Sequence, residues 1–120
     1  MLKKENNKIY DLEERTFKFA RAVIEFTNVL PKTIANNEII KQVVRSSGSV
    51  GANYIEANES LSKKDFAFRI KISRKEAKES LYWLKLLQVN GKDLSEKQQS
   101  LIDEATELMK IFGSIVEKVK

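Results

Sequence analysis

The sequence predicts an all-α protein, an antiparallel up-down-up-down four-helix bundle that forms a single domain over residues 1–120. Three observations favour this fold. Four segments repeat apolar residues at the spacing of one helix face, and no segment alternates apolar and polar residues as a strand does. The loops between these segments are short, as in a simple bundle. One Pro and four Gly in 120 residues leave room for long helices.

The composition argues against several classes of function. The chain contains no Cys and no His, so it lacks disulfides, thiolate zinc ligands and the commonest general base. We therefore predict no catalytic residue, no metal site and no cofactor, and a protein that is not an enzyme. The first seven residues have no apolar core, and no apolar run approaches the roughly 20 residues that span a bilayer. These features predict a cytoplasmic protein without a signal peptide or a membrane partner.

The first helix is predicted over residues 11–30. Asp11 is its predicted N-cap, because Glu14 three residues later completes a pattern like a capping box. Pro31 ends the helix, since a residue before proline avoids helical geometry. A wide apolar face points to the core, and a second apolar stripe repeats every seven residues: Tyr10, Phe17 and Ile24. This stripe is either buried within the bundle or forms a subunit contact, which we favour because monomers rarely expose such rows.

The second helix is predicted over residues 37–60, with Asn36 or Asn37 as its N-cap. Its centre is rich in small residues and includes Gly48 and Gly51. Each glycine inside a helix costs up to about 1 kcal/mol relative to Ala, so we expect a compensating close approach of another backbone on the packed face. A helical projection places the following residues on the face opposite the core: Arg45, Ser46, Ser49, Ala52, Asn53 and Glu56.

The third and fourth helices are predicted over residues 62–90 and 95–119. Ser62 with Asp65 forms a capping box at the start of the third helix, and Asn90-Gly91 is a strong signal for its end. Ser95 with Gln98 is predicted to cap the fourth helix. The fourth helix carries a single apolar stripe, from Leu101 to Val119.

The third helix has a basic face beside its core face. Residues 62–92 carry nine Lys or Arg against three Asp or Glu, a net charge of +6, while the whole chain carries +5. Six cations form this basic face: Lys64, Lys71, Arg74, Lys75, Lys78 and Lys85. The lysines lie within an arc of about 80° without an acid among them. Such a row is either a solvated surface or a site for nucleic-acid phosphates. Tyr82 shares the arc and is either a base-stacking platform or an ordinary surface tyrosine.

A third face of the same helix is apolar again. It consists of Phe68, Ile72, Trp83 and Leu86, with Glu79 among them. A bundle helix needs only one apolar stripe, so the second stripe predicts contact with a neighbouring subunit. Trp is enriched at the energetic centres of such interfaces.

The polar residues of the second helix allow two interpretations. Ser46, Ser49, Asn53 and Glu56 can be imagined as a catalytic cluster, but without His a serine nucleophile lacks its usual activating base. We favour a hydrogen-bonding network at a contact between helices or subunits.

The second helix contains the pattern Arg45-Ser46-Ser47-x-Ser49-Val50-x-x-Asn53-x-x-Glu56, and the third helix ends in Tyr82-Trp83-Leu84-Lys85-Leu86-Leu87. On these residues the chain resembles the four-helix-bundle family of proteins encoded in 23S rRNA intervening sequences, over about residues 8–118. That family is also similar to the accessory variability determinant of diversity-generating retroelements. The resemblance implies a homopentameric barrel of bundles and, from the retroelement relatives, a basic surface that binds nucleic acid.

Together these features predict a non-enzymatic homo-oligomer that binds the backbone of RNA or DNA through the basic face. The alternative is an oligomeric scaffold that docks another protein on the polar face of the second helix and binds no nucleic acid.

Overall fold

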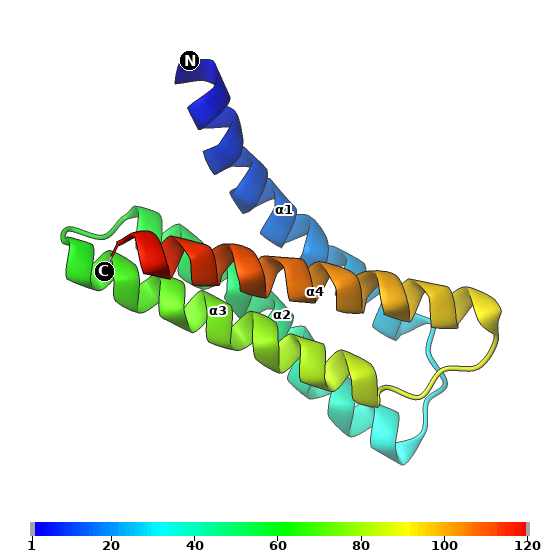
Figure 1. The fold of residues 1–120 in the computed structure, drawn as a ribbon. Coiled ribbons are helices and arrows are strands. Elements are labelled where there is room, and N and C mark those ends of the chain that lie inside the picture. Colours follow the sequence, from blue (N-terminus) through cyan, green and yellow to red (C-terminus); the bar gives the residue numbers. More distant parts are fainter. Residues whose placement is uncertain (1, 120) are drawn as a thin grey trace.

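The protein folds into helices that pack against one another, as the sequence predicts (Figure 1). The computed structural model describes the backbone of residues 2–119 and the side chains of residues 12–119. Within this part of the chain there are four helices and no strand. The helices are α1 (Leu2–Asn28), α2 (Ile34–Asn58), α3 (Lys63–Leu86) and α4 (Lys92–Lys118).

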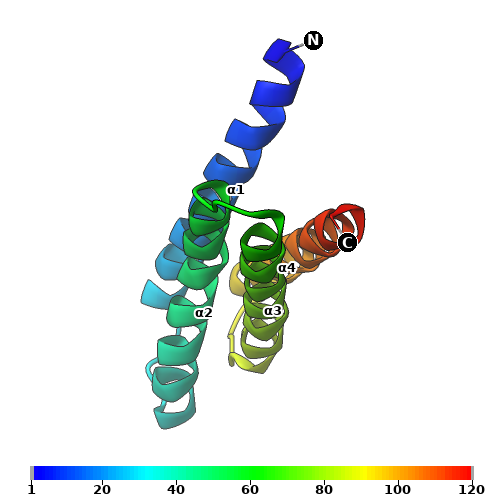
Figure 2. The same ribbon diagram turned by 90° about the vertical axis from the view of Figure 1, so that its left-hand side faces the viewer.

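The helices follow an up-down-up-down path, and each packs against its neighbours along the chain (Figure 1). The cycle is closed by contact between α1 and α4, which is the least extensive of the four helix pairs, whereas α2 and α3 have the most extensive contact. The first turns of α1 extend past the other three helices (Figure 2). The bundle is therefore built around the α2–α3 pair.

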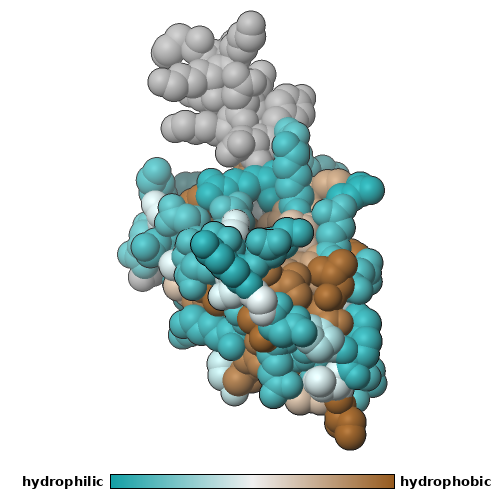
Figure 3. Space-filling model, turned by 90° about the vertical axis from the view of Figure 1, so that its right-hand side faces the viewer, coloured by the Kyte–Doolittle hydropathy of each residue, from teal (hydrophilic) through white to brown (hydrophobic). Residues whose placement is uncertain are grey.

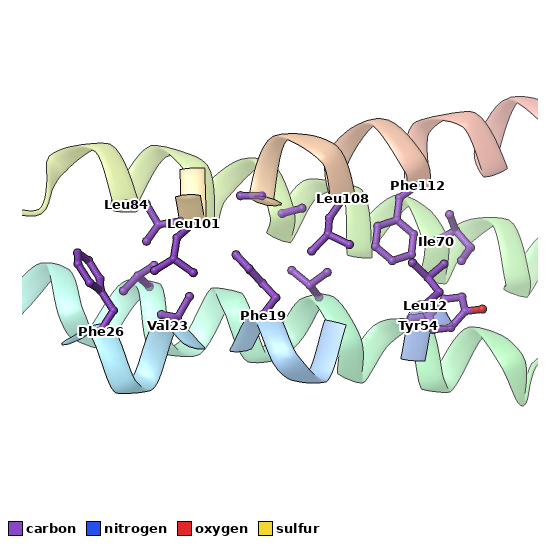
Figure 4. Packing of buried hydrophobic residues seen from close by; sticks show 14 of the residues in the cluster. Leu12, Phe19, Val23, Phe26, Tyr54, Ile70, Leu84, Leu101, Leu108 and Phe112 are labelled. Carbon is purple, nitrogen blue, oxygen red and sulfur yellow. The ribbon is translucent and has the colours of Figure 1, made fainter. Parts of the chain in front are cut away.

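The core lies between the four helices, whose apolar side chains point toward one another (Figure 4). The largest fully buried apolar side chains are Phe112, Ile70, Leu84, Leu108, Val23, Val43 and Val50. Removing each such side chain from water contributes about 1.5–3 kcal/mol to folding. The α1 face predicted from its periodicity is buried over Leu12, Thr16, Phe19, Val23, Phe26, Thr27 and Leu30.

Helix α1 begins earlier than predicted. It starts at Leu2, so Asp11 lies inside the helix and is not its N-cap. Residues 2–10 contain no Gly or Pro and several good helix formers, so nothing in them stops the helix from continuing toward the N-terminus. The C-terminal end of α1 is stabilised by Lys32, whose Nζ donates to the carbonyl oxygen of Thr27 at 2.9 Å. A cation at this end satisfies a helix carbonyl and complements the helix dipole.

The N-cap of α2 is Thr33 and not Asn36 or Asn37. The Thr33 hydroxyl accepts a hydrogen bond from the backbone N–H of Asn36 at 3.0 Å. The Asn36 side chain is fully buried and joins two loops instead. Its Nδ2 donates to the carbonyls of Pro31 and Gln88, at 3.0 and 2.9 Å, and its Oδ1 accepts from the Gln88 N–H at 2.9 Å.

The junction of α3 and α4 also differs from the prediction. Ser62 caps α3 as predicted, accepting from the Asp65 N–H at 3.1 Å. However, α3 ends at Leu86 and α4 begins at Lys92, so Ser95 is not a cap. Gln98 reaches back from α4, and its Nε2 donates to the carbonyls of Leu84 and Leu87 at 2.8 and 2.9 Å.

The end of the bundle that carries these loops, α1–α2 and α3–α4, is mostly hydrophilic at its surface (Figure 3). Gly91 lies in the second of these loops with a φ of 89°, a value that favours glycine. The Asn90-Gly91 signal therefore marks the loop correctly, although the helix has already ended.

The two glycines of α2 have different surroundings. A Cβ on Gly51 would lie 2.7 Å from Thr16 Oγ1 and 3.1 Å from Thr16 Cβ, whereas a Cβ on Gly48 would meet nothing within 4 Å. Thr16 is fully buried on α1. Gly51 therefore permits the close approach of α1 and α2 that the sequence led us to expect, and Gly48 permits no such contact within the protomer.

We expect opposite effects from adding one methyl group at these positions. Gly51→Ala should lower the free energy of unfolding by about 1–3 kcal/mol, because the buried Thr16 cannot move aside without strain. Gly48→Ala should raise it by up to about 1 kcal/mol, because alanine is the better helix former and the site is open. Urea denaturation of both variants at one protein concentration measures the difference. Equal effects of the two substitutions would contradict the close α1–α2 packing.

Candidate interaction surfaces

The polar residues of the α2 pattern meet α3 rather than solvent. The Arg45 guanidinium pairs with two carboxylates of α3, with Nη1 3.3 Å from Glu76 Oε1 and Nη2 2.5 Å from Glu79 Oε1. The Glu79 carboxylate also accepts a hydrogen bond of 3.3 Å from the indole Nε1 of Trp83. Glu76 is buried, with 7% of its surface exposed, and Arg45 supplies a cation beside it. Arg45 therefore holds both carboxylates at the α2 side of α3.

Ser46 does not lie on the outward face where the helical projection placed it. It is fully buried, and its hydroxyl shares a hydrogen bond of 2.8 Å with the hydroxyl of Ser80. One helical turn away, the hydroxyl of Ser73 donates to the carbonyl of Val50 at 2.9 Å. A small side chain whose hydroxyl is hydrogen-bonded can be buried with little penalty. These serines therefore let the two helix backbones come close together.

The remaining residues of the pattern are arranged around the same contact. Arg69 of α3 donates to Asn53 Oδ1 at 3.2 Å, and Asn53 Nδ2 donates to the carbonyl of Ser49 at 2.9 Å. Ser47 is fully buried, whereas Glu56 is exposed. Most of the pattern thus forms a hydrogen-bonded α2–α3 interface inside one protomer.

Sequence analysis missed the α3 half of this interface. Neither Ser80 nor Glu76 was predicted to be a partner of the second helix. The signal that could have revealed them is the run of Ser73, Glu76, Ala77 and Ser80 at intervals of three and four residues. On α2 a matching run of small residues follows Arg45, so the two helices carry complementary small, polar faces.

The basic face of α3 is exposed along its whole length. All six of its cations are exposed: Lys64, Lys71, Arg74, Lys75, Lys78 and Lys85. No carboxylate of the described residues pairs with any of them. The nearby acids of α3, Glu76 and Glu79, are turned to Arg45. Of the three acids of α3, only Asp65 in the first turn is not paired with Arg45, so little negative charge on this helix competes with the row.

The two apolar stripes are only partly exposed. On α1, Phe17 and Ile24 expose 62% and 46% of their surface, and the side chain of Tyr10 lies outside the described residues. On α3, Phe68 and Leu86 expose 60% and 44%. The other two α3 members, Ile72 and Trp83, are half-buried, and Trp83 packs against the core. A hollow of about 400 Å³ lies over the α1 stripe between Phe17 and Ile24.

Ion pairs show on which side of each helix these stripes lie. Arg15 reaches α4, where its Nε lies 2.7 Å from Glu104 Oε2. Phe17 follows two residues later, about 200° around the helix, and so lies on the side of α1 away from α4. On α3 the apolar stripe shares its face with Glu79, which pairs with Arg45 of α2. Both stripes therefore flank α2.

The basic face lies on the other side of α3. Arg74, at its edge, is the α3 residue nearest Gly113 of α4, since a Cβ built on that glycine would lie 3.5 Å from Arg74 Cδ. The basic face therefore begins at α4 with Arg74 and adjoins the α3 apolar stripe on its other side, where Phe68 lies between Lys64 and Lys71 at helical spacing.

Metal-binding clusters, clefts and titratable groups are the features of the described residues that bear on a catalytic role. The described residues hold no cluster of three side chains able to bind a metal ion. Two adjoining clefts of about 470 and 430 Å³ lie between α1 and α4, and the Arg15–Glu104 pair lies at the first of them. Burial raises the pKa of the Tyr54 phenol above its usual value, and a hydrogen bond with Asn58 opposes this effect. In the described part of the chain, no helix has the length and apolar content needed to cross a bilayer.

The fold and these surfaces define an all-helical bundle protein whose polar sequence pattern joins two of its own helices. Comparison with known families matches residues 7–114 to the 23S rRNA-intervening sequence protein family, and the chain belongs to that family. The match covers the whole α2–α3 interface.

One solved structure is similar over nearly the whole chain. It is a Bacteroides thetaiotaomicron protein described as having unknown function and belonging to the S23 ribosomal protein family. The two share 30% sequence identity and a TM-score of 0.73, and the match covers 87% of this chain and 96% of the other. A comparison with curated proteins found no match.

The Arg45 pairs lead to a test of the α2–α3 interface. Arg45→Ala should lower the free energy of unfolding by about 1–3 kcal/mol, because it leaves the buried Glu76 carboxylate without a cation. Glu76→Gln in the same chain should restore part of this loss, since glutamine keeps the shape and removes the charge. Urea denaturation at constant protein concentration provides the measurement.

The matched control is Lys41→Ala, which removes a cation from the same helix. Its pair with Glu38 is exposed, at 71% for both side chains, and such pairs contribute about 0–1 kcal/mol. If Arg45→Ala costs no more than Lys41→Ala, the pattern does not stabilise the α2–α3 interface.

Proposed function

We propose that the protein is a non-enzymatic homo-oligomer, a pentamer, that binds the backbone of RNA or DNA through the basic face of α3. The observation that carries this proposal is the row of six exposed cations with no carboxylate partner among the described residues. Its ends, Lys64 and Lys85, are separated by about 30 Å along the helix axis. A row of this kind neutralises several phosphates and releases their counterions.

The arrangement of acids supports the same function. Asp65 lies in the first turn of α3, and the other two acids of the helix pair with Arg45. The exposed charge on this side of α3 is therefore mostly positive. Cations spaced along one helix neutralise phosphates whatever the base sequence, so binding should depend mainly on charge.

The scaffold alternative has less support. It requires a free polar face on α2, but Arg45, Ser46 and Asn53 are engaged by α3. What remains outward on α2 is a narrower surface that includes Glu56.

The apolar stripes support the assembly. Phe17 and Ile24 on α1 and Phe68 and Leu86 on α3 are large apolar side chains exposed to solvent in the protomer. Burial of each against a second copy contributes about 1.5–3 kcal/mol before the costs of association. The number five comes from the resemblance to the family and not from these stripes. Closed symmetry would repeat the basic face in every subunit and strengthen its field.

Charge reversal on the basic face tests nucleic-acid binding. We expect the wild-type protein to bind RNA and DNA with little sequence preference and with a steep dependence on salt. The slope of log affinity against log salt should be about 0.9 per duplex phosphate neutralised, or about 0.7 for single strands. Changing Lys71, Lys75 and Lys78 together to Glu should abolish binding without dissociating the oligomer.

The matched control has the same change in charge at three lysines on other helices. Lys18, Lys41 and Lys97 are exposed, and their triple change to Glu should weaken binding only modestly. Fluorescence anisotropy with labelled oligonucleotides measures the affinity, and light scattering measures the assembly. If both triple variants lose the same affinity, binding reflects only the net charge of the protein and not the basic face. If the wild-type protein does not bind nucleic acid at low salt, the scaffold alternative is favoured.

A separate substitution tests the assembly. We expect light scattering at micromolar concentration to show an oligomer for the wild type and smaller species for Phe17→Glu and Phe68→Glu, because each places a charge in a contact that excludes water. Ile34→Glu is the control, since Ile34 is 88% exposed and belongs to neither stripe. A stable wild-type monomer would refute the assembly, whereas another oligomer would refute only the number five.

A further inference from the structure

Tyr82 lies within the basic face, near its C-terminal end. It follows Lys78 by four residues and precedes Lys85 by three, so the three side chains are neighbours on one side of α3. Tyr82 exposes 58% of its surface, and both lysines are exposed as well. An aromatic ring is thus presented between two cations that have no carboxylate partner among the described residues.

The ring is supported from one side by Trp83. The two ring centroids are 5.0 Å apart with an interplanar angle of 73°, which is an edge-to-face contact. Trp83 itself packs against the core, and its Nε1 donates to Glu79 Oε1 at 3.3 Å. The tyrosine therefore stands against a fixed neighbour, and an aromatic platform of this kind loses little conformational freedom when it binds.

We propose that the basic face binds single-stranded nucleic acid, with an unpaired base stacked on Tyr82 and neighbouring phosphates bound by Lys78 and Lys85. This inference rests on the proposed function and specifies its ligand. In a duplex both faces of each base are already stacked, so a ring on a helix surface can reach a base only in a single strand. Stacking on an aromatic ring is possible for every base, so it adds affinity without a sequence preference.

The experiment compares the wild type with Tyr82→Ala and Tyr82→Phe. The probes are labelled oligo(dT) and oligo(U) of equal length, a duplex, and an abasic strand that keeps the phosphates and lacks the bases. Tyr82→Ala should weaken binding to both single strands roughly 5- to 100-fold, the loss expected for one stacked base. Tyr82→Phe should bind like the wild type, and binding to the duplex and the abasic strand should not change between the three proteins.

A second readout comes from Trp83, the only tryptophan of the chain. Because it contacts Tyr82, its fluorescence should change when oligo(dT) binds and should change much less with the abasic strand. Circular dichroism and light scattering establish that both variants keep the fold and assembly of the wild type, as expected for an exposed side chain.

Each result can be assigned to one proposal. If Tyr82→Ala binds oligo(dT) and oligo(U) as tightly as the wild type, while the triple lysine variant does not bind, stacking is refuted and the basic face stands. Equal affinity of the wild type for the abasic strand and oligo(dT) also refutes stacking. If the wild type binds none of the probes at low salt, the proposed function fails and this inference fails with it.

Discussion

The close approach of α2 to its two neighbours is the constraint on which the rest of the structure depends. Toward α1 it requires Gly51, because any side chain there would meet the buried Thr16. Toward α3 it requires small residues, and hydroxyls that hydrogen-bond across the contact, such as those of Ser46 and Ser80. All of these polar groups have partners, since no buried side-chain N or O atom of the described residues lacks a hydrogen bond. A larger apolar residue at any of these positions would separate the helices and open the core behind them.

This packing also determines how charge is distributed on α3. Arg45 reaches over the small residues and pairs with Glu76 and Glu79, which draws the negative charge of α3 to the α2 side. The lysines remain on the opposite side, beside α4. The basic face is therefore a consequence of the α2–α3 interface as well as of the number of lysines, because unpaired carboxylates within reach would reduce its attraction for phosphate.

The sequence predicts the helices and the core better than it predicts the helix ends. Periodicity identified all four helices, and the capping box at Ser62 was correct because it depends on residues three apart. The start of α2 and the end of α3 were wrong because Asn36 and Gln98 make hydrogen bonds to residues in other loops and helices. A local pattern contains no information about such partners. Ser46 was misplaced for a related reason, since only the neighbouring Ser80 makes its burial favourable.

On the candidate surfaces, too, local spacing predicts some features correctly, whereas others depend on contacts between helices. The exposure of the lysines follows from their spacing on one helix. Trp83 illustrates what spacing cannot show, because it belongs to an apolar stripe but is half-buried and supports Tyr82 instead of facing fully outward. On α2, Gly48 and Ala52 are small exposed residues that lie between the stripes of α1 and α3. A Cβ on Gly48 would meet nothing within 4 Å, so in the proposed assembly this glycine would let a second copy approach α2 closely. The apolar stripes flank these small residues of α2, and the lysines of α3 lie farther from them. An assembly formed through α2 and the stripes would therefore leave the basic face of each subunit open to a nucleic acid.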